Sequence, residues 1–208
     1  MSNLANISIF DYGAGNLYSL KHSLEKNGAS VTIVNKLENI EDYQGLVLPG
    51  VGNFDPAARS IKPYKKKLRK LIEKNVPILG ICLGMEMLFK NSEEGKLQGL
   101  NILDGKVIIL PKKNVKIPHM GWNSLDIINK NSKILQDIED KSWVYFVHSY
   151  HIVPSKKNII IAKSKYGKNI PVVIEENNLF GTQFHPEKSG KIGRKIIRNF
   201  LRVCNQKR

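Results

Sequence analysis

The first half of the chain alternates strand-like apolar segments with helix-like segments, and several of the turns between them contain glycine. The apolar segments are 7–11, 31–34, 45–49 and 77–81, and helical spacing occupies 16–27, part of 56–75 and 83–89. Strands connected by helices pair in parallel, and the helices then cover both faces of the sheet. The pattern therefore predicts an α/β fold with an open, mostly parallel central sheet flanked by helices.

The second half is richer in strands, at 106–110, 143–147, 158–163, 172–175 and 179–184, and it ends in a helical pattern at 192–203. We expect these strands to add antiparallel neighbours to the central sheet. The loop around Gly95 and the basic stretch 111–118 are the most insertion-like parts. Because the chain has 208 residues and no long linker, it is predicted to form a single domain over 1–208.

The chain is strongly basic, with a formal net charge of +15. These charges are dispersed, and the densest run, 62–72, has the apolar spacing of an amphipathic helix. No zinc-finger, RRM or helix-turn-helix motif accompanies the charge. We therefore expect a solvated surface or an acidic partner protein rather than nucleic acid, which remains a rival interpretation.

Targeting and redox signals are weak. No apolar run approaches the roughly 18 to 20 residues of a membrane span, and the first residues lack the pattern of a signal peptide. Cys82 and Cys204 are too few for a disulfide framework, and neither has a partner at metal-ligand spacing. The sequence thus predicts a cytoplasmic protein with no membrane attachment and no metal.

The motif Gly80-Ile-Cys82-Leu-Gly84 is the strongest local signal. A buried strand ends there and a helix begins, with glycine two positions on either side of a nucleophile, as in a nucleophile elbow. Such a turn lifts the thiol above the sheet and directs the backbone N–H of Leu83 at a developing oxyanion. The helix N-terminus also favours the thiolate. The alternative is a buried core cysteine.

A cysteine nucleophile needs a base, and two histidines follow strand-like segments. His185 stands before Pro186 and Glu187, whose carboxylate can orient an imidazole. His148 follows the apolar segment 143–147. Periodicity does not choose between the two, and a lone histidine is often only structural.

Two glycine loops, 11–16 and 50–54, follow strands and allow close approach of a ligand, although either one can be a simple turn. Neither has the spacing of a phosphate-binding or dinucleotide-binding loop.

Six motifs occur in one order along the chain: Asp11-Tyr-Gly-Ala-Gly-Asn16, Leu48-Pro-Gly-Val-Gly-Asn-Phe54, Gly80-Ile-Cys-Leu-Gly-Met85, Pro118-His-Met-Gly-Trp-Asn123, Phe146-Val-His-Ser-Tyr150 and Phe184-His-Pro-Glu-Lys-Ser189. This order resembles the glutaminase subunits of imidazole glycerol phosphate synthases, a family of class I (triad) glutamine amidotransferases. The resemblance covers essentially the whole chain. It implies a flavodoxin-like sheet, hydrolysis of L-glutamine and no cofactor.

The resemblance assigns roles to the reacting groups. It makes Cys82 the nucleophile that forms a γ-glutamyl thioester, His185 the base and acid, and Glu187 the residue that holds the imidazole. It makes the backbone N–H groups of Leu83 and Val51 the oxyanion donors.

The resemblance also implies which residues hold the substrate. Gly50 and Gly52 let the Val51 peptide rotate, while Ser149, Tyr150 and Glu94 match positions that bind the α-carboxylate and α-amino groups of glutamine. A negative Glu94 suits an ammonium group.

Glu86 departs from the family, which usually has glutamine four positions after the nucleophile, in contact with the substrate. A carboxylate donates no hydrogen bond unless it is protonated, and it places negative charge near the thiolate. We still expect a working glutaminase.

The resemblance also implies a partner. Family members pass ammonia to a (β/α)8-barrel synthase subunit, in a heterodimer that makes imidazole glycerol phosphate and an aminoimidazole carboxamide ribotide for histidine biosynthesis. Ligand binding in the barrel typically activates the glutaminase. Met120, Trp122, Tyr145 and Lys188 match the surface that faces the barrel.

Three other functions compete. A paralogous subunit can supply ammonia to a synthase of amidino or amino sugars. A cysteine hydrolase or stress protein of similar fold can use the elbow for other chemistry, although the His-Pro-Glu motif opposes this. A basic, non-catalytic nucleic-acid-binding protein is the third.

Overall fold

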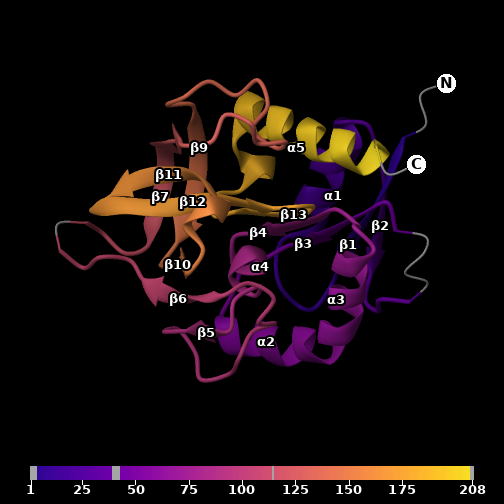
Figure 1. The fold of residues 1–208 in the computed structure, drawn as a ribbon, viewed down its shortest axis with the longest axis horizontal. Helices are drawn as coiled ribbons and strands as arrows, with labels where there is room; N and C mark the ends of the chain where they lie inside the picture. Colours follow the sequence, from indigo (N-terminus) through magenta and orange to yellow (C-terminus); the bar gives the residue numbers. More distant parts are fainter. Residues whose placement is uncertain (1–3, 39–42, 114, 207–208) are drawn as a thin grey trace.

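A computed structural model describes residues 4–38, 43–113 and 115–206. Its centre is an eight-stranded sheet in the order β2-β1-β3-β4-β13-β12-β11-β8 (Figure 1). The first five of these strands are parallel to one another: β2 (Ala29–Val34), β1 (Ala5–Phe10), β3 (Gly45–Leu48), β4 (Ile78–Ile81) and β13 (Leu179–Thr182). The expected parallel α/β sheet is confirmed.

The sheet continues with antiparallel strands from the second half of the chain. These are β12 (Lys168–Glu176), β11 (Ile160–Tyr166) and the short β8 (Asp126–Ile127). The antiparallel additions are therefore confirmed too. Because β13 returns to pair with β4, the chain after β13 starts beside the end of β4.

Helices cover both faces of the sheet (Figure 1). α1 (Leu17–Lys26) and α5 (Gly190–Asn205) pack on one face, and α2 (Phe54–Ile61) and α3 (Lys65–Glu73) pack on the other. The helix expected within 56–75 is thus two helices, separated by a 3₁₀ turn that contains Pro63. The basic run lies on α3, which buries only Leu68 and Leu71.

α4 (Leu83–Glu86) is shorter than the helix expected at 83–89. The N–H groups of Leu88 and Phe89 bond to carbonyls three residues back, so the chain tightens and turns instead of continuing. The segment is buried on every side, which weakens the helical periodicity as a guide to its end.

Two small sheets lie beside the antiparallel strands β11 and β12 of the central sheet (Figure 1). One contains β10 (Tyr150–Pro154), β6 (Gly105–Ile109) and β5 (Asn91–Ser92), and the other pairs β7 (His119–Ser124) with β9 (Trp143–His148). The strands β5, β7, β8 and β10 were not predicted from the sequence. β7 is polar and contains glycine, and it is a strand because β9 supplies its hydrogen-bond partners.

Within the described ranges, no helix is long and apolar enough to cross a membrane.

Candidate active site

Cys82 follows β4 at the carboxyl edge of the parallel sheet, in a strained turn with φ 51° and ψ −113°. Its N–H donates to the carbonyl of Thr182 on β13 at 2.7 Å. A Cβ at Gly84 would lie 2.0 Å from the Leu48 oxygen, and a Cβ at Gly80 would lie 2.8 Å from the Met85 Cα. The turn therefore requires both glycines of the motif, as expected of a nucleophile elbow.

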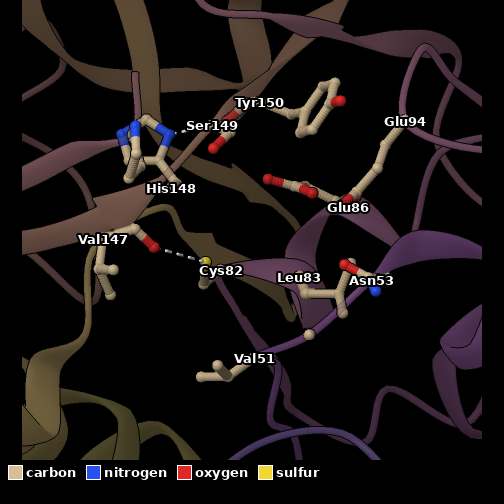
Figure 2. Close-up of a pocket in the computed structure, with 12 residues that line it drawn as sticks. Val51, Asn53, Cys82, Leu83, Glu86, Glu94, Val147, His148, Ser149 and Tyr150 are labelled. Carbon is tan, nitrogen blue, oxygen red and sulfur yellow. Dashed lines mark hydrogen bonds between the residues drawn. The ribbon is translucent and has the colours of Figure 1, made fainter. Parts of the chain in front are cut away.

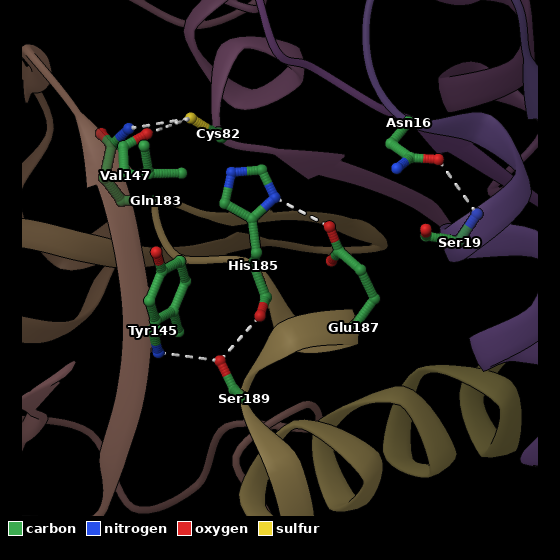
Figure 3. A network of polar contacts seen from close by, with 9 residues as sticks. All are labelled: Asn16, Ser19, Cys82, Tyr145, Val147, Gln183, His185, Glu187 and Ser189. Carbon is green, nitrogen blue, oxygen red and sulfur yellow. Dashed lines mark hydrogen bonds and ion pairs between the residues drawn. The ribbon is translucent and has the colours of Figure 1, made fainter. Parts of the chain in front are cut away.

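The thiol of Cys82 is enclosed by polar groups of two other strands. Its Sγ lies 3.8 Å from the Val147 carbonyl on β9 and 3.8 Å from Nε2 of Gln183, which follows β13 (Figure 3). Burial raises the pKa of Cys82 most, and the Glu86 charge raises it further, while the Leu83 N–H lowers it. The resting group is a thiol that needs a base.

His185 lies between Cys82 and Glu187, just before a 3₁₀ turn at Pro186–Lys188 (Figure 3). Its Nδ1 lies 2.8 Å from Glu187 Oε1, and its Nε2 is buried with no hydrogen-bond partner among the described residues. A ring that donates from Nδ1 keeps Nε2 as an acceptor, which is the state a general base requires.

His148, the other candidate base, has both ring nitrogens occupied. Its Nδ1 donates to the Tyr150 carbonyl at 2.7 Å, and its Nε2 accepts from His119 Nδ1 at 3.1 Å. Burial lowers the pKa of His148 to about 3, so this ring stays neutral. The geometry favours His185 as the base and gives His148 a structural place in the pocket wall.

A pocket of about 270 Å³ opens above the elbow (Figure 2). Eight of its lining residues are among the candidates from the sequence: Val51, Gly52, Cys82, Leu83, Glu86, Glu94, Ser149 and Tyr150. Three others were not, namely Asn53, Pro118 and Val147, and the twelfth is His148, the second candidate base from the sequence. Gly50 lies behind this wall, where a Cβ would approach the Gly84 nitrogen to 2.2 Å. The structure thus brings together segments from four separate parts of the chain.

Glu86 is buried in the pocket wall, with 4% of its surface exposed. Gln183 Nε2 donates to its Oε1 at 2.9 Å. Burial raises the pKa of Glu86 to about 8, despite this hydrogen bond, and the Glu94 charge acts in the same direction. At neutral pH Glu86 is therefore mostly a neutral acid.

Two residues near the pocket were not predicted from the sequence. Gln183 contacts both Cys82 and Glu86, and its position two residues before His185 on an extended segment was the available signal. Tyr12, in the first glycine loop, donates its hydroxyl to the Pro49 carbonyl. In the same loop, the Gly15 N–H donates to the Val51 carbonyl at 3.2 Å, which ties the loop to the pocket wall.

The residues expected at a partner surface lie on β7, β9 and the turn that follows β13. Met120 is 64% exposed and Trp122 is 51% exposed, and Tyr145 packs edge-on against Trp122 with ring centroids 5.9 Å apart. Lys188 is exposed. Trp143, also on β9 and 58% exposed, was not expected.

Over the described residues, no group of three or more His, Cys, Asp or Glu side chains is placed to hold a metal ion.

The fold and the elbow define a class of protein. A family model described as "Glutamine amidotransferase class-I" matches residues 8–204, so the chain belongs to the class I glutamine amidotransferases. Relatives then define the family within this class. The chain is 46% identical over 198 residues to "Imidazole glycerol phosphate synthase subunit HisH" of Methanocaldococcus jannaschii, covering 95% of this chain and 99% of that protein. It belongs to the HisH family.

Other relatives agree. The HisH subunit of Caldanaerobacter subterraneus is 46% identical, covering 93% of this chain and 96% of that protein, and the one from Methanosarcina mazei is 43% identical, covering 97% and 100%. Membership excludes an unrelated cysteine hydrolase.

Solved structures agree on the fold. A chain of PurLQS from Thermotoga maritima has a TM-score of 0.77 at 20% identity, covering 96% of this chain and 99% of that one. The Trypanosoma brucei CTPS glutaminase domain with bound acivicin has a TM-score of 0.71 at 17% identity, covering 98% and 94%.

Proposed function

We propose that this chain hydrolyses L-glutamine to glutamate and ammonia through a triad of Cys82, His185 and Glu187. The observation that carries the proposal is the imidazole of His185, held by Glu187 through Nδ1 and left with a buried, unpartnered Nε2 on its other side, as far as the described residues go. His185 takes the thiol proton as Cys82 attacks the side-chain amide. The same proton then goes to the departing ammonia, and water hydrolyses the γ-glutamyl thioester.

The tetrahedral intermediate carries a negative oxygen, which needs donors. The Leu83 N–H, at the start of α4 beside the sulfur, is one candidate. The Val51 N–H is the second candidate. Gly52, with φ 132°, gives the adjoining backbone the freedom to reorient.

The same pocket has groups suited to the amino-acid end of glutamine. Glu94 lines it and offers a carboxylate to the ammonium group, and Ser149 and Tyr150 line the same end of the pocket (Figure 2). We assign substrate binding to these residues, together with Gly50 and Gly52 as the glycines that shape the wall.

The HisH relatives are named as subunits of imidazole glycerol phosphate synthase. By analogy, we propose that residues 1–208 form one amidotransferase domain that pairs with a (β/α)8-barrel synthase subunit in the cytoplasm. Ammonia passes to the barrel, which makes imidazole glycerol phosphate and an aminoimidazole carboxamide ribotide for histidine biosynthesis. The exposed Met120 and Trp122, with Tyr145 and Lys188, are the proposed contact surface.

The test measures glutamate release by the purified chain, alone and with the cognate barrel subunit and its nucleotide ligand, beside Cys82→Ala. We expect strong activation by the liganded partner and no activity in the variant. Glutamate release that is unchanged by the partner would support the glutaminase activity but indicate that the chain serves a different synthase. Absence of activity in every condition would overturn the proposal.

A further inference from the structure

Glu86 is a buried ionisable group that the proposed triad does not use. It lies one turn after Cys82 on α4, and its carboxyl group points into the pocket (Figure 2). Isolated buried carboxylates are costly, because an ion loses its hydration and needs a countercharge. A charged Glu86 therefore needs a cation nearby.

Among the described residues, the groups that face Glu86 supply no cation. Those that interact with it electrostatically are the Cys82 thiol, Glu94, Tyr12 from the loop after β1 and Tyr150 from β10, all of which are acids. The pocket histidine, His148, is neutral and has both nitrogens engaged. The site therefore favours the protonated form of Glu86, in agreement with a pKa raised to about 8.

The hydrogen bonds locate the proton. Oε1 accepts from Gln183 Nε2 at 2.9 Å, and no partner is found for the other oxygen among the described residues. A neutral acid in this arrangement carries its proton on Oε2, towards the pocket. The Gln183 amide that binds Glu86 also lies 3.8 Å from Cys82 Sγ. The Gln183 amide therefore contacts both Cys82 and Glu86, and each of these two groups becomes negative when it loses a proton.

We propose that Glu86 is a substrate-positioning residue that acts as a neutral carboxylic acid, and that its ionisation switches the glutaminase off at alkaline pH. This inference rests on the proposed function. The protonated form donates its O–H to the bound glutamine. Loss of the proton replaces a donor by an acceptor and adds a negative charge beside Cys82. Both changes reduce activity, because glutamine binds less well and the thiolate becomes harder to form.

The first test compares the pH dependence of glutamate release in the assembled complex for the native chain, Glu86→Gln and Glu73→Gln, from about pH 6 to about pH 10. Glutamine at position 86 keeps a donor and does not titrate, whereas Glu73 is exposed on α3 and is the matched control. We expect kcat/KM of the native chain and the control to fall about tenfold per pH unit above about pH 8, largely through KM. Glu86→Gln should show no such fall. The same alkaline fall in all three proteins would overturn the proposal.

The second test needs no glutaminase activity. Alkylation of Cys82 by iodoacetamide is followed by peptide mass spectrometry as the pH is raised. Glu86→Gln should react at least about tenfold faster than the native chain near pH 9, because a thiolate without a neighbouring carboxylate forms at lower pH. Equal rates would contradict the charge coupling. Faster alkylation without glutamate release from any protein would instead reject the proposed function and retain the coupling.

Discussion

At the scale of single residues, Cys82 combines two unfavourable states. Its backbone has φ 51°, a conformation that costs a non-glycine residue on the order of 1–3 kcal/mol, and its thiol is buried beside Glu86. The turn can maintain the strained backbone and the buried thiol because Gly84, which has no Cβ, lets α4 begin directly against β3. The turn places the Leu83 N–H beside the sulfur, and both residues line the pocket.

Substitution of Gly84 tests this account. Gly84→Ala would place its Cβ 2.0 Å from the Leu48 oxygen, a backbone atom that cannot move aside, and we expect a loss of roughly 3 kcal/mol or more in the free energy of unfolding. Gly13→Ala is the control, because its Cβ meets nothing within 4 Å and only its φ of 83° is strained. It should cost about 1 kcal/mol in urea unfolding. Equal losses would contradict a steric origin.

Glu86 also predicts a pH dependence of stability. Its pKa rises from 4.5 to about 8 on folding, so the unfolded chain loses this proton first as the pH increases. Stability from this group is complete below about pH 4.5 and is lost as the pH rises through about 8. Glu86→Gln should therefore be more stable than the native chain at pH 9, by roughly 3–5 kcal/mol. Denaturant unfolding at several pH values measures this, and an unchanged profile in the variant would contradict it.

At the scale of elements, Ser189 connects the histidine turn to β9. It is buried, its Oγ donates to the His185 carbonyl at 2.7 Å, and it accepts from the Tyr145 N–H at 3.0 Å (Figure 3). The His185 N–H in turn donates to the Tyr145 carbonyl at 3.0 Å. The base is thus fixed to a strand of the proposed partner surface.

Ser189→Ala should loosen this connection. It leaves the part-buried Tyr145 N–H without its partner, while the His185 carbonyl still accepts from the Lys188 N–H at 3.0 Å, and we expect a loss of about 1–3 kcal/mol in stability. Because His185 loses one of the contacts that hold its backbone, kcat for glutamate release should fall by about tenfold, with little change in KM. Ser23→Ala, in α1, serves as the control. A stability loss with unchanged kcat would show that Ser189 does not position the base.

At the scale of the whole molecule, the pocket opens beside β7 and β9, the strands that carry exposed aromatic residues. Exposed tryptophans that pack on a neighbouring ring are typical anchors of protein interfaces. Trp122→Ala should weaken binding of the proposed synthase subunit by about 2 kcal/mol or more in isothermal titration calorimetry. Trp143→Ala, at the first residue of β9 and two positions along the strand pair from Tyr145, which faces Trp122, should have a small effect. A larger loss of binding for Trp143→Ala than for Trp122→Ala would instead place the interface at the start of β9.

Much of this arrangement could be predicted from the sequence. Cys82 is recognisable because the glycines at positions 80 and 84 are needed by its own turn, and the parallel sheet is recognisable from apolar strands of the first half. These features depend on local sterics and on the periodicity of burial, which act over a few residues.

Contacts between distant segments had to come from the tertiary structure. β7 is a strand only because it pairs with β9, and His185 rather than His148 has a free nitrogen only because His119, Tyr150 and Glu187 lie where the fold places them. The charge state of Glu86 follows the same rule. The sequence determined that a carboxyl group stands four residues after Cys82. The tertiary structure decided that this group is buried among acids and Gln183. The reason is that the solvation of a side chain depends on how the molecule packs around it and not on the residue type alone.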